Sequence, residues 1–353
     1  MNFTELFTPA AIAANWAEVQ SNRVPYLGEA LFTNQKKAGL DLSWIRGSKG
    51  LPVSLMPSTF DAQATFRDRI GVQKVETEMP FFREGFKIKE RDRQELLRVT
   101  EADDPYAEAV MGRVFDDANT LIEGAAVVRE RMRMQLLFPV NGDVGITIKA
   151  NGVDYTYDYD AANTWKGTNY FALTSTALWS ATSTADPFAD IETAKNAVRT
   201  NTGSELVTAI MNSTTFNLLP KIDAVRNRFI SSVGVANAYI TGQNVTDVFR
   251  DTNGITIAVY DKMYKNESGT AAKFVPDGYV ALVPAGSLGS VFFGTTPEEA
   301  DGAAAPMTVA LVDTGVAVSR IVEPHPVNIN TIVSEIVLPS YERMDEVAVL
   351  KVI

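Results

Sequence analysis

Residues 254–293 have the sequence GITIAVYDKMYKNESGTAAKFVPDGYVALVPAGSLGSVFF. Ile255, Ile257 and Val259 alternate with small or polar residues, which predicts a strand, and later apolar runs predict further strands. The clusters 266–269 and 276–278 are rich in turn-forming residues. The stretch therefore predicts a strand, a polar hairpin, a second strand and, after a Pro-Ala-Gly break, another apolar strand, with no residue that points to catalysis at first inspection.

The composition is that of an ordinary folded protein and excludes several kinds of site. The chain has 353 residues, 46% of them hydrophobic and 21% charged, which is enough for one large domain or two. It has no cysteine, which excludes a disulfide framework, a thiolate zinc site and a cysteine nucleophile, and which fits a reducing compartment. No apolar run is long enough to cross a membrane, and the first residues lack the pattern of a signal peptide.

The charge distribution argues against direct recognition of nucleic acid. The formal net charge is −11, and residues 139–353 carry 14 basic and 23 acidic side chains. A protein that binds nucleic acid specifically usually has a basic stripe or domain, whereas an acidic surface repels a polyanion. We therefore expect no sequence-specific binding of DNA.

The first hundred residues predict a short helix followed by extended chain. Thr8 can cap a helix and Pro9 can take its first position, so a helix is predicted over 10–19. Residues 21–50 have no periodicity, and two interpretations stay open: a loop packed on its own domain, or an arm packed on a neighbouring subunit. Residues 65–98 alternate as strands do and are highly charged, which predicts either a β-ribbon that lies on another surface or a solvated edge hairpin.

The clearest helix is predicted between two prolines. Asp103 or Asp104 can cap it, Pro105 takes its first position, and Pro139 stops it. A rod of about 33 residues is about 50 Å long, which favours an elongated subunit. The apolar residues recur at spacings of three and four in one narrow stripe, which predicts incomplete burial: Val110, Val114, Ala118, Leu121, Ala125, Val128 and Met132. Three arginines near its end are interpreted as cations stabilised by the helix dipole: Arg129, Arg131 and Arg133.

Residues after Pro139 predict a mixture of strands and short helices. Residues 145–149 and 153–157 flank Asn151-Gly152, a strong hairpin signal, and residues 160–186 are predicted to be a surface excursion. Asp186-Pro187 predicts the start of a helix over 188–200, and a strand is predicted over 205–211. A helical stretch is predicted over 213–229, capped by Ser213 and interrupted at Pro220. The last predicted elements are strands over 332–338 and 346–353. Strands and helices do not alternate regularly, so the predicted fold class is α+β.

Motifs that would carry catalysis or hold a metal are missing. His325 is the single histidine, and the common glycine-rich phosphate loops do not occur. Asp154, Asp158 and Asp160 look like part of a calcium loop, but the glycine and the distal glutamate of that motif are absent. We therefore expect no metal site, no cofactor and no catalytic residue.

A serine hydrolase is one alternative. Residues 285–289, AGSLG, fit a relaxed nucleophile-elbow pattern around Ser287, and Asp313 and His325 follow in the order of an α/β-hydrolase triad. The elbow needs a helix after the serine, whereas residues 290–294 predict a strand. His325 also stands between two prolines. This alternative is therefore the weaker one.

The order of the predicted parts resembles the major capsid proteins of tailed bacteriophages, and the phage lambda major head protein family in particular. The stretches that carry the resemblance are Asp186–Glu192 (DPFADIE), Phe216–Phe229, Ile255–Tyr260 with the hairpin that ends in Lys273–Asp277 (KFVPD), and Leu338-Pro339 followed by Asp345–Val347. They cover residues 186–353, whereas residues 1–185 match in architecture only.

The resemblance implies an α+β tailed-phage major capsid fold in five parts. These are an N-terminal arm (1–48), an extended β-loop (49–98), a peripheral domain with a spine helix (99–185), an axial domain (186–315) and a return to the peripheral domain (316–353).

The resemblance also implies a structural protein, not an enzyme, that self-assembles into hexamers and pentamers of an icosahedral shell enclosing phage DNA. The implied partners are further copies of the chain, a separate scaffolding protein, a portal and, as an optional partner, a decoration protein; no membrane is involved. The protein would belong to the virion and assemble in the cytoplasm of the bacterial host. An encapsulin-like nanocompartment shell, which shares the fold, is the second alternative. We expect no covalent cross-link between subunits.

Overall fold

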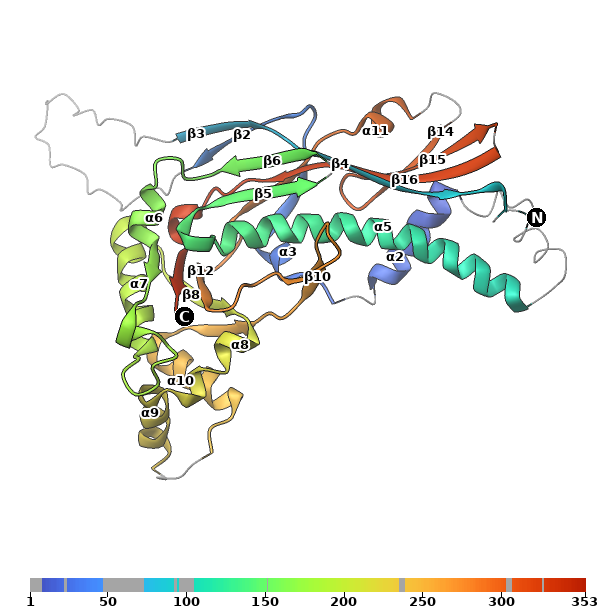
Figure 1. Ribbon diagram of the computed structural model, residues 1–353. Helices are drawn as coiled ribbons and strands as arrows, with labels where there is room; N and C mark the ends of the chain where they lie inside the picture. Colours follow the sequence, from blue (N-terminus) through green and yellow to red (C-terminus); the bar gives the residue numbers. More distant parts are fainter. Residues whose placement is uncertain are drawn as a thin grey trace, which may run out of the picture. The chain divides into compact units, whose positions relative to one another are not determined.

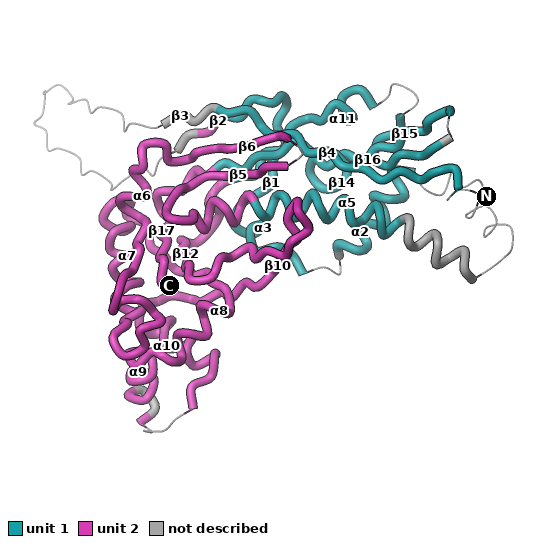
Figure 2. The backbone as a smooth tube through the Cα atoms, in the orientation of Figure 1, with its two compact units in different colours: residues 1–43, 76–131, 290–340 teal, residues 44–75, 132–289, 341–353 magenta. Residues whose placement is uncertain are grey.

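The structure is a computed structural model of the chain, and it describes residues 8–21, 24–46, 73–91, 94, 105–150, 152–234, 239–302, 307–325 and 327–353. The chain forms two compact units, shown in Figures 1 and 2. Unit 1 comprises residues 1–43, 76–131 and 290–340, and unit 2 comprises residues 44–75, 132–289 and 341–353. Neither unit is a continuous segment, because the chain passes from one to the other several times.

Unit 1 is built on a six-stranded sheet. Its strands are β1 (Phe32–Lys36), β4 (Phe81–Ile88), β13 (Gly289–Phe293), β14 (Met307–Val312), β15 (Val316–Pro324) and β16 (Val327–Pro339). Their order is β1-β13-β16-β15-β14, and β4 also pairs with β16. The long strand β16 pairs antiparallel with β15 on one edge, and with β4 and then β13 on the other. β16 therefore ties together strands that are far apart in the sequence.

The helices of unit 1 lie against this sheet. They are α2 (Pro9–Ser21), α3 (Leu27–Leu31), α11 (Pro297–Asp301) and the first part of α5 (Pro105–Leu137). α2 packs against β14 and β15 and buries Ile12 and Trp16. Thr8 Oγ1 accepts a hydrogen bond from the Ala11 amide at 3.2 Å, which confirms the predicted cap. Phe32 of β1 is fully buried in the unit, so this part of residues 21–50 packs on its own domain.

The long helix α5 confirms one prediction and corrects another. It begins at Pro105 and ends at Leu137, two residues before Pro139; the candidate caps Asp103 and Asp104 lie outside the described residues. The prediction of a narrow stripe is wrong for the last turns, where nearly every side chain is buried, including Arg129 and Glu130. Arg129 is buried with the ionic partners described below, and Glu130 accepts a hydrogen bond from the Gly28 amide at 3.0 Å.

Unit 2 is built on a five-stranded sheet in the order β7-β17-β12-β8-β9. Its strands are β7 (Tyr170–Ala172), β8 (Leu206–Met211), β9 (Thr256–Val259), β12 (Tyr279–Pro284) and β17 (Ala348–Lys351). The central strand β12 is buried along its whole length and runs antiparallel to both neighbours. Smaller two-stranded sheets are formed by β5 (Gly145–Ala150) with β6 (Val153–Asp158), by β10 (Met263–Lys265) with β11 (Ala271–Lys273), and by β2 (Asp41–Arg46) with β3 (Gln73–Glu78). The first two of these are the predicted hairpins.

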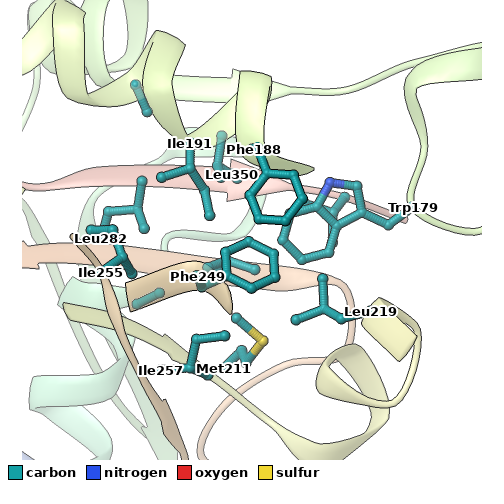
Figure 3. Packing of buried hydrophobic residues seen from close by; sticks show 14 of the residues in the cluster. Trp179, Phe188, Ile191, Met211, Leu219, Phe249, Ile255, Ile257, Leu282 and Leu350 are labelled. Carbon is teal, nitrogen blue, oxygen red and sulfur yellow. The ribbon is translucent and has the colours of Figure 1, made fainter. Parts of the chain in front are cut away.

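The core of unit 2 forms where helices cover this sheet. The helices are α6 (Thr164–Asn169), α7 (Pro187–Thr202), α8 (Ser213–Phe216), α9 (Asp223–Val233) and α10 (Gly242–Asn253), and single 3-10 turns span Val140–Gly142, Ser175–Ala177, Leu219–Lys221 and Met344–Glu346. Figure 3 shows Phe188 of α7 against Phe249 of α10, with a distance of 4.5 Å between ring centroids. Leu282 of β12 and Leu350 of β17 belong to the same cluster and are fully buried.

Two local predictions in unit 2 need correction. Many of residues 160–186 are exposed, as predicted, but Trp165 and Trp179 are 1% and 0% exposed. The Trp165 indole N–H donates to two backbone carbonyls, those of Met344 and Val347, so buried tryptophans anchor this segment to the unit. Ser213 does not cap α8: the side chain of Asn212 accepts from the Thr215 amide instead.

Candidate functional site

Two residues of the hydrolase alternative have structural partners, and the third is exposed. Ser287 Oγ donates to the Gly289 carbonyl at 2.7 Å, and Asp313 accepts from Arg129 Nη2 at 3.1 Å. His325 is exposed in the turn after β15. Ser287 belongs to unit 2, whereas Asp313 and His325 belong to unit 1. β12 is followed by β13, as predicted, so the serine lies between two strands and outside the strand-to-helix turn that an elbow requires.

The loop that carries Ser287 is shaped by backbone contacts. Arg343 Nη1 donates to the carbonyls of Ala285 and Ser287 at 2.9 and 3.0 Å. Gly286 has a φ of +89°, a backbone conformation that glycine adopts without steric cost. The Ala-Gly-Ser-Leu-Gly segment is therefore a tight connection between strands, fixed by one arginine.

The three aspartates of the calcium-loop pattern also have separate structural roles. Asp154 pairs with Lys149 at 2.6 Å, and Asp160 accepts from the amides of Trp165 and Lys166 at the start of α6. Within the described residues there is no group of three or more acidic or histidine side chains that could hold a metal ion. No helix in the same residues is long and apolar enough to span a membrane.

The most unusual group of polar side chains is a buried ionic cluster in unit 1. Arg129 of α5 donates through Nη1 to Glu335 of β16 at 2.9 Å and through Nη2 to Asp313 at 3.1 Å. Its guanidinium also lies over the Phe293 ring, 5.5 Å from the centroid. The side chains of Arg129, Glu335 and Asp313 are 6%, 1% and 14% exposed. The cluster therefore fixes the helix to β16 and to the turn between β14 and β15.

Arg129 was interpreted from the sequence as a cation that interacts with the helix dipole, and the structure assigns it a different partner. No signal in the sequence indicates Glu335 or Asp313, because they follow it by 206 and 184 residues. A buried ion pair of this kind fixes geometry more than it adds stability, since desolvation offsets much of the attraction.

A second group of ion pairs holds α11 to the sheet. Ser334 Oγ donates to Glu298 Oε2 at 2.9 Å, and Arg83 of β4 pairs with the same glutamate. The next residue, Glu299, pairs with Lys36 of β1 at 2.5 Å. The two consecutive glutamates of α11 thus connect the helix to strands from three distant parts of the sequence.

The outer strand β4 is fixed to the sheet by a further charged cluster. Lys87 Nζ donates to Glu323 of β15 at 2.8 Å, and the same carboxylate accepts from the side-chain amides of Asn328 and Asn330. Lys87, Asn330 and Asn328, in that order of effect, lower the pKa of Glu323 to about 2. The described end of the predicted β-loop is therefore an integral strand of unit 1.

The polar hairpin β10–β11 has a rigid base in unit 2. Asn212, which is fully buried, donates to the Val275 carbonyl at 3.1 Å and to Asp277 Oδ1 at 2.6 Å. Lys273 donates to the same carboxylate oxygen at 2.7 Å and is the largest cause of the lowered pKa of Asp277. The sequence identified the turn but gave no indication that Asn212 anchors it.

The geometry described so far consists of networks that fix strands and helices to one another. In the described residues the surface hollows are shallow and open, such as one of about 570 Å³ lined by Phe216, Lys221 and Tyr239 among others. Such an arrangement suits a rigid building block.

The structure is similar to those of several phage proteins. A phage-related protein from Bordetella bronchiseptica RB50 matches with a TM-score of 0.57 and 13% identity over 96% of both chains. A candidate capsid protein of a prophage from E. coli CFT073 matches with a TM-score of 0.58 and 13% identity over 98% of this chain and 99% of that chain. A chain of the cyanophage A-1(L) capsid matches with a TM-score of 0.52 and 12% identity over 93% and 92%. These likenesses confirm the predicted α+β tailed-phage capsid fold.

Comparisons of sequence give the family. No curated protein matches the chain. A family model described as phage major capsid protein E, however, matches residues 8–352. Because that match extends over nearly the whole sequence, the chain belongs to the phage major capsid protein E family.

Proposed function

We propose that copies of this chain form the hexamers and pentamers of an icosahedral shell that encloses phage DNA. The observation that carries the proposal is the family match over residues 8–352, which makes the chain a structural capsid protein and a component of the virion. The networks described above support a role as a rigid subunit, and the acidic net charge of −11 allows a shell to enclose DNA without binding it tightly.

We retain the five-part division of the subunit as part of this proposal. In it, residues 99–185 form a peripheral domain whose spine is α5, residues 186–315 form an axial domain that begins with α7, and residues 316–353 return to the peripheral domain. Residues 1–48 are the arm and 49–98 the extended β-loop. The start of α5 at Pro105 and of α7 at Pro187 supports these boundaries; residues 49–72 lie outside the described part of the chain.

The proposal includes partners and a place of assembly. A separate scaffolding protein, a portal and, as an optional partner, a decoration protein act with the shell, and assembly takes place in the host cytoplasm. The lack of cysteine fits a reducing compartment. We also propose that the chain has no enzymatic activity; the structural partners of Ser287 and Asp313, and the assignment of Ser287 to one unit and of Asp313 and His325 to the other, support this view.

Electron microscopy of the expressed chain, alone and together with its proposed scaffolding protein, tests the proposal. Closed shells or sheets of capsomers are the expected result. A monodisperse monomer that hydrolyses esters and is labelled by a fluorophosphonate at Ser287 would contradict it. Ser287→Ala is the control: because its hydroxyl donates to a carbonyl in its own loop, we expect it to assemble like the parent chain.

The nucleic-acid content of native particles separates the two kinds of shell. Particles filled with phage DNA are expected if the chain forms a virion. Particles that instead hold a cargo enzyme and no genome would favour the encapsulin-like alternative.

A further inference from the structure

The edge strand β14 has an unusual composition for an exposed edge. Its sequence, MTVALV, contains no charged residue, proline or glycine. Within the described residues it lies at one end of the sheet order and pairs only with β15 (Figure 1). α2 and α11 pack against it, yet Thr308 remains exposed and Leu311 is 48% exposed.

The other outer strand of this part of the sheet, β4, has the opposite character. It carries Arg83, Glu84 and Lys87 as exposed residues. Charged residues on an edge strand prevent its pairing with other chains, and short uncharged strands with apolar and β-branched residues promote it. β4 is therefore protected against edge pairing, whereas β14 is not.

We propose that β14 pairs antiparallel with β14 of a second copy of the chain, across a two-fold axis between capsomers. The inference rests on the proposed function, because an icosahedral shell supplies such axes. A two-fold contact places the same surface on both sides. It thus brings an uncharged strand against an uncharged strand, whereas pairing with β4 would place apolar residues beside three charges.

The alternation of side chains limits the register of this contact. Residues that are directly opposite in an antiparallel pair point to the same face of the sheet. A two-fold axis perpendicular to the sheet must then pass midway between the two copies of one residue. The central residues of β14 are Val309 and Ala310. An axis at Val309 places Thr308 opposite Ala310 of the second copy, whereas an axis at Ala310 places Ala310 opposite Ala310 of the second copy.

Disulfide trapping tests both registers at once, because the chain has no cysteine of its own. A variant with Thr308→Cys and Ala310→Cys places a cysteine opposite a cysteine in either register. Opposite Cβ atoms in a sheet are about 4.5–5.5 Å apart, and a disulfide spans the near end of this range. The control is Glu84→Cys with Phe86→Cys, a pair at the same spacing on the charged outer strand β4, where both side chains are exposed. Both variants are assembled, oxidised and run on a non-reducing gel.

We expect the β14 variant to give a dimer in most subunits and the β4 control to remain monomeric. Assembled particles without dimer, in which the thiols still react with maleimide, overturn the inference but leave the proposed function intact. A ladder beyond the dimer, or equal dimer in both variants, also overturns it. If the parent chain forms no particles at all, the proposed function fails and the inference fails with it.

A charge on the strand gives a second test that needs no cross-link. Leu311→Lys is expected to reduce the yield of particles at least tenfold, with an unchanged circular dichroism spectrum of the free subunit. The control is Phe86→Lys on the charged strand β4, where the side chain is 43% exposed, and it should assemble normally. Normal assembly of Leu311→Lys would contradict the inference.

Discussion

Replacing Arg129 with methionine should destabilise unit 1 by about 3–5 kcal/mol. The substitution removes the guanidinium that donates to Glu335 and Asp313 and leaves the Glu335 carboxylate, whose side chain is 1% exposed, without its cationic partner. Removal of one partner of a buried pair typically has this cost, because the remaining charge is still desolvated. Compared with a total stability of about 5–15 kcal/mol for a typical domain, this is a large loss.

Hydrogen exchange read by mass spectrometry is the assay that fits the two-unit subunit. Peptides from β15 and β16 report the opening free energy of unit 1 in the unassembled subunit. The control is Lys87→Met, which removes the exposed pair with Glu323, where the two side chains are 45% and 34% exposed. Solvent screens an exposed pair of this kind, so this variant should change the opening free energy little.

A double variant separates the buried charge from the lost packing. Arg129→Met with Glu335→Leu removes both charges, and it should recover at least about 2 kcal/mol of the loss, since well-packed apolar replacements of a buried pair are often neutral. The reasoning is refuted if Arg129→Met changes the opening free energy no more than Lys87→Met does, or if the double variant is no more stable than the single one.

Three further predictions concern pH, covalent state and a glycine. The pKa of Glu323 is lowered from an ordinary 4.5 to about 2. The ionised carboxylate therefore stabilises the fold above pH 4.5, and this stabilisation is lost as the pH falls toward 2. The difference in melting temperature between the parent chain and Glu323→Gln should shrink over that range, and a constant difference would contradict the prediction. Boiled particles should run as single subunits on a denaturing gel, because Lys87 Nζ is engaged by the Glu323 carboxylate at 2.8 Å; a ladder of cross-linked subunits would count against this. Gly142→Ala should lower the free energy of unfolding in urea by about 1–3 kcal/mol more than Gly152→Ala does. Both glycines have a positive φ, +84° and +78°. An added Cβ at Gly142 would lie 2.8 Å from the Tyr170 ring, whereas the space at Gly152 is open. Equal losses would refute the steric argument.

Sequence signals that act over a few residues predicted local structure well. Pro105 begins α5 and Asp186 caps α7 through the amides of Phe188 and Ala189. The hairpin expected around Gly152 is the pair β5–β6. These predictions succeed because a proline, a capping carboxylate or a turn glycine acts on backbone groups within four residues of itself.

Signals that depend on distant partners could not be interpreted in the same way. Residues 160–186 look like a polar excursion, but Trp165 is buried because the carbonyls of Met344 and Val347 accept its indole N–H. Arg129 looks like a surface cation at a helix end, but acidic residues about 200 positions later make it a buried one. Composition alone cannot indicate that such partners will meet.

By itself the sequence determined the positions of the main helices and hairpins, the α+β class and, through the order of its parts, the capsid family, since all of these follow from local periodicity, capping and chain order. Only the tertiary structure decided which charges are buried together and which strand edge remains open. Arg129, Glu335 and the uncharged edge of β14 illustrate the reason: burial and pairing depend on which distant segments the sheet brings together.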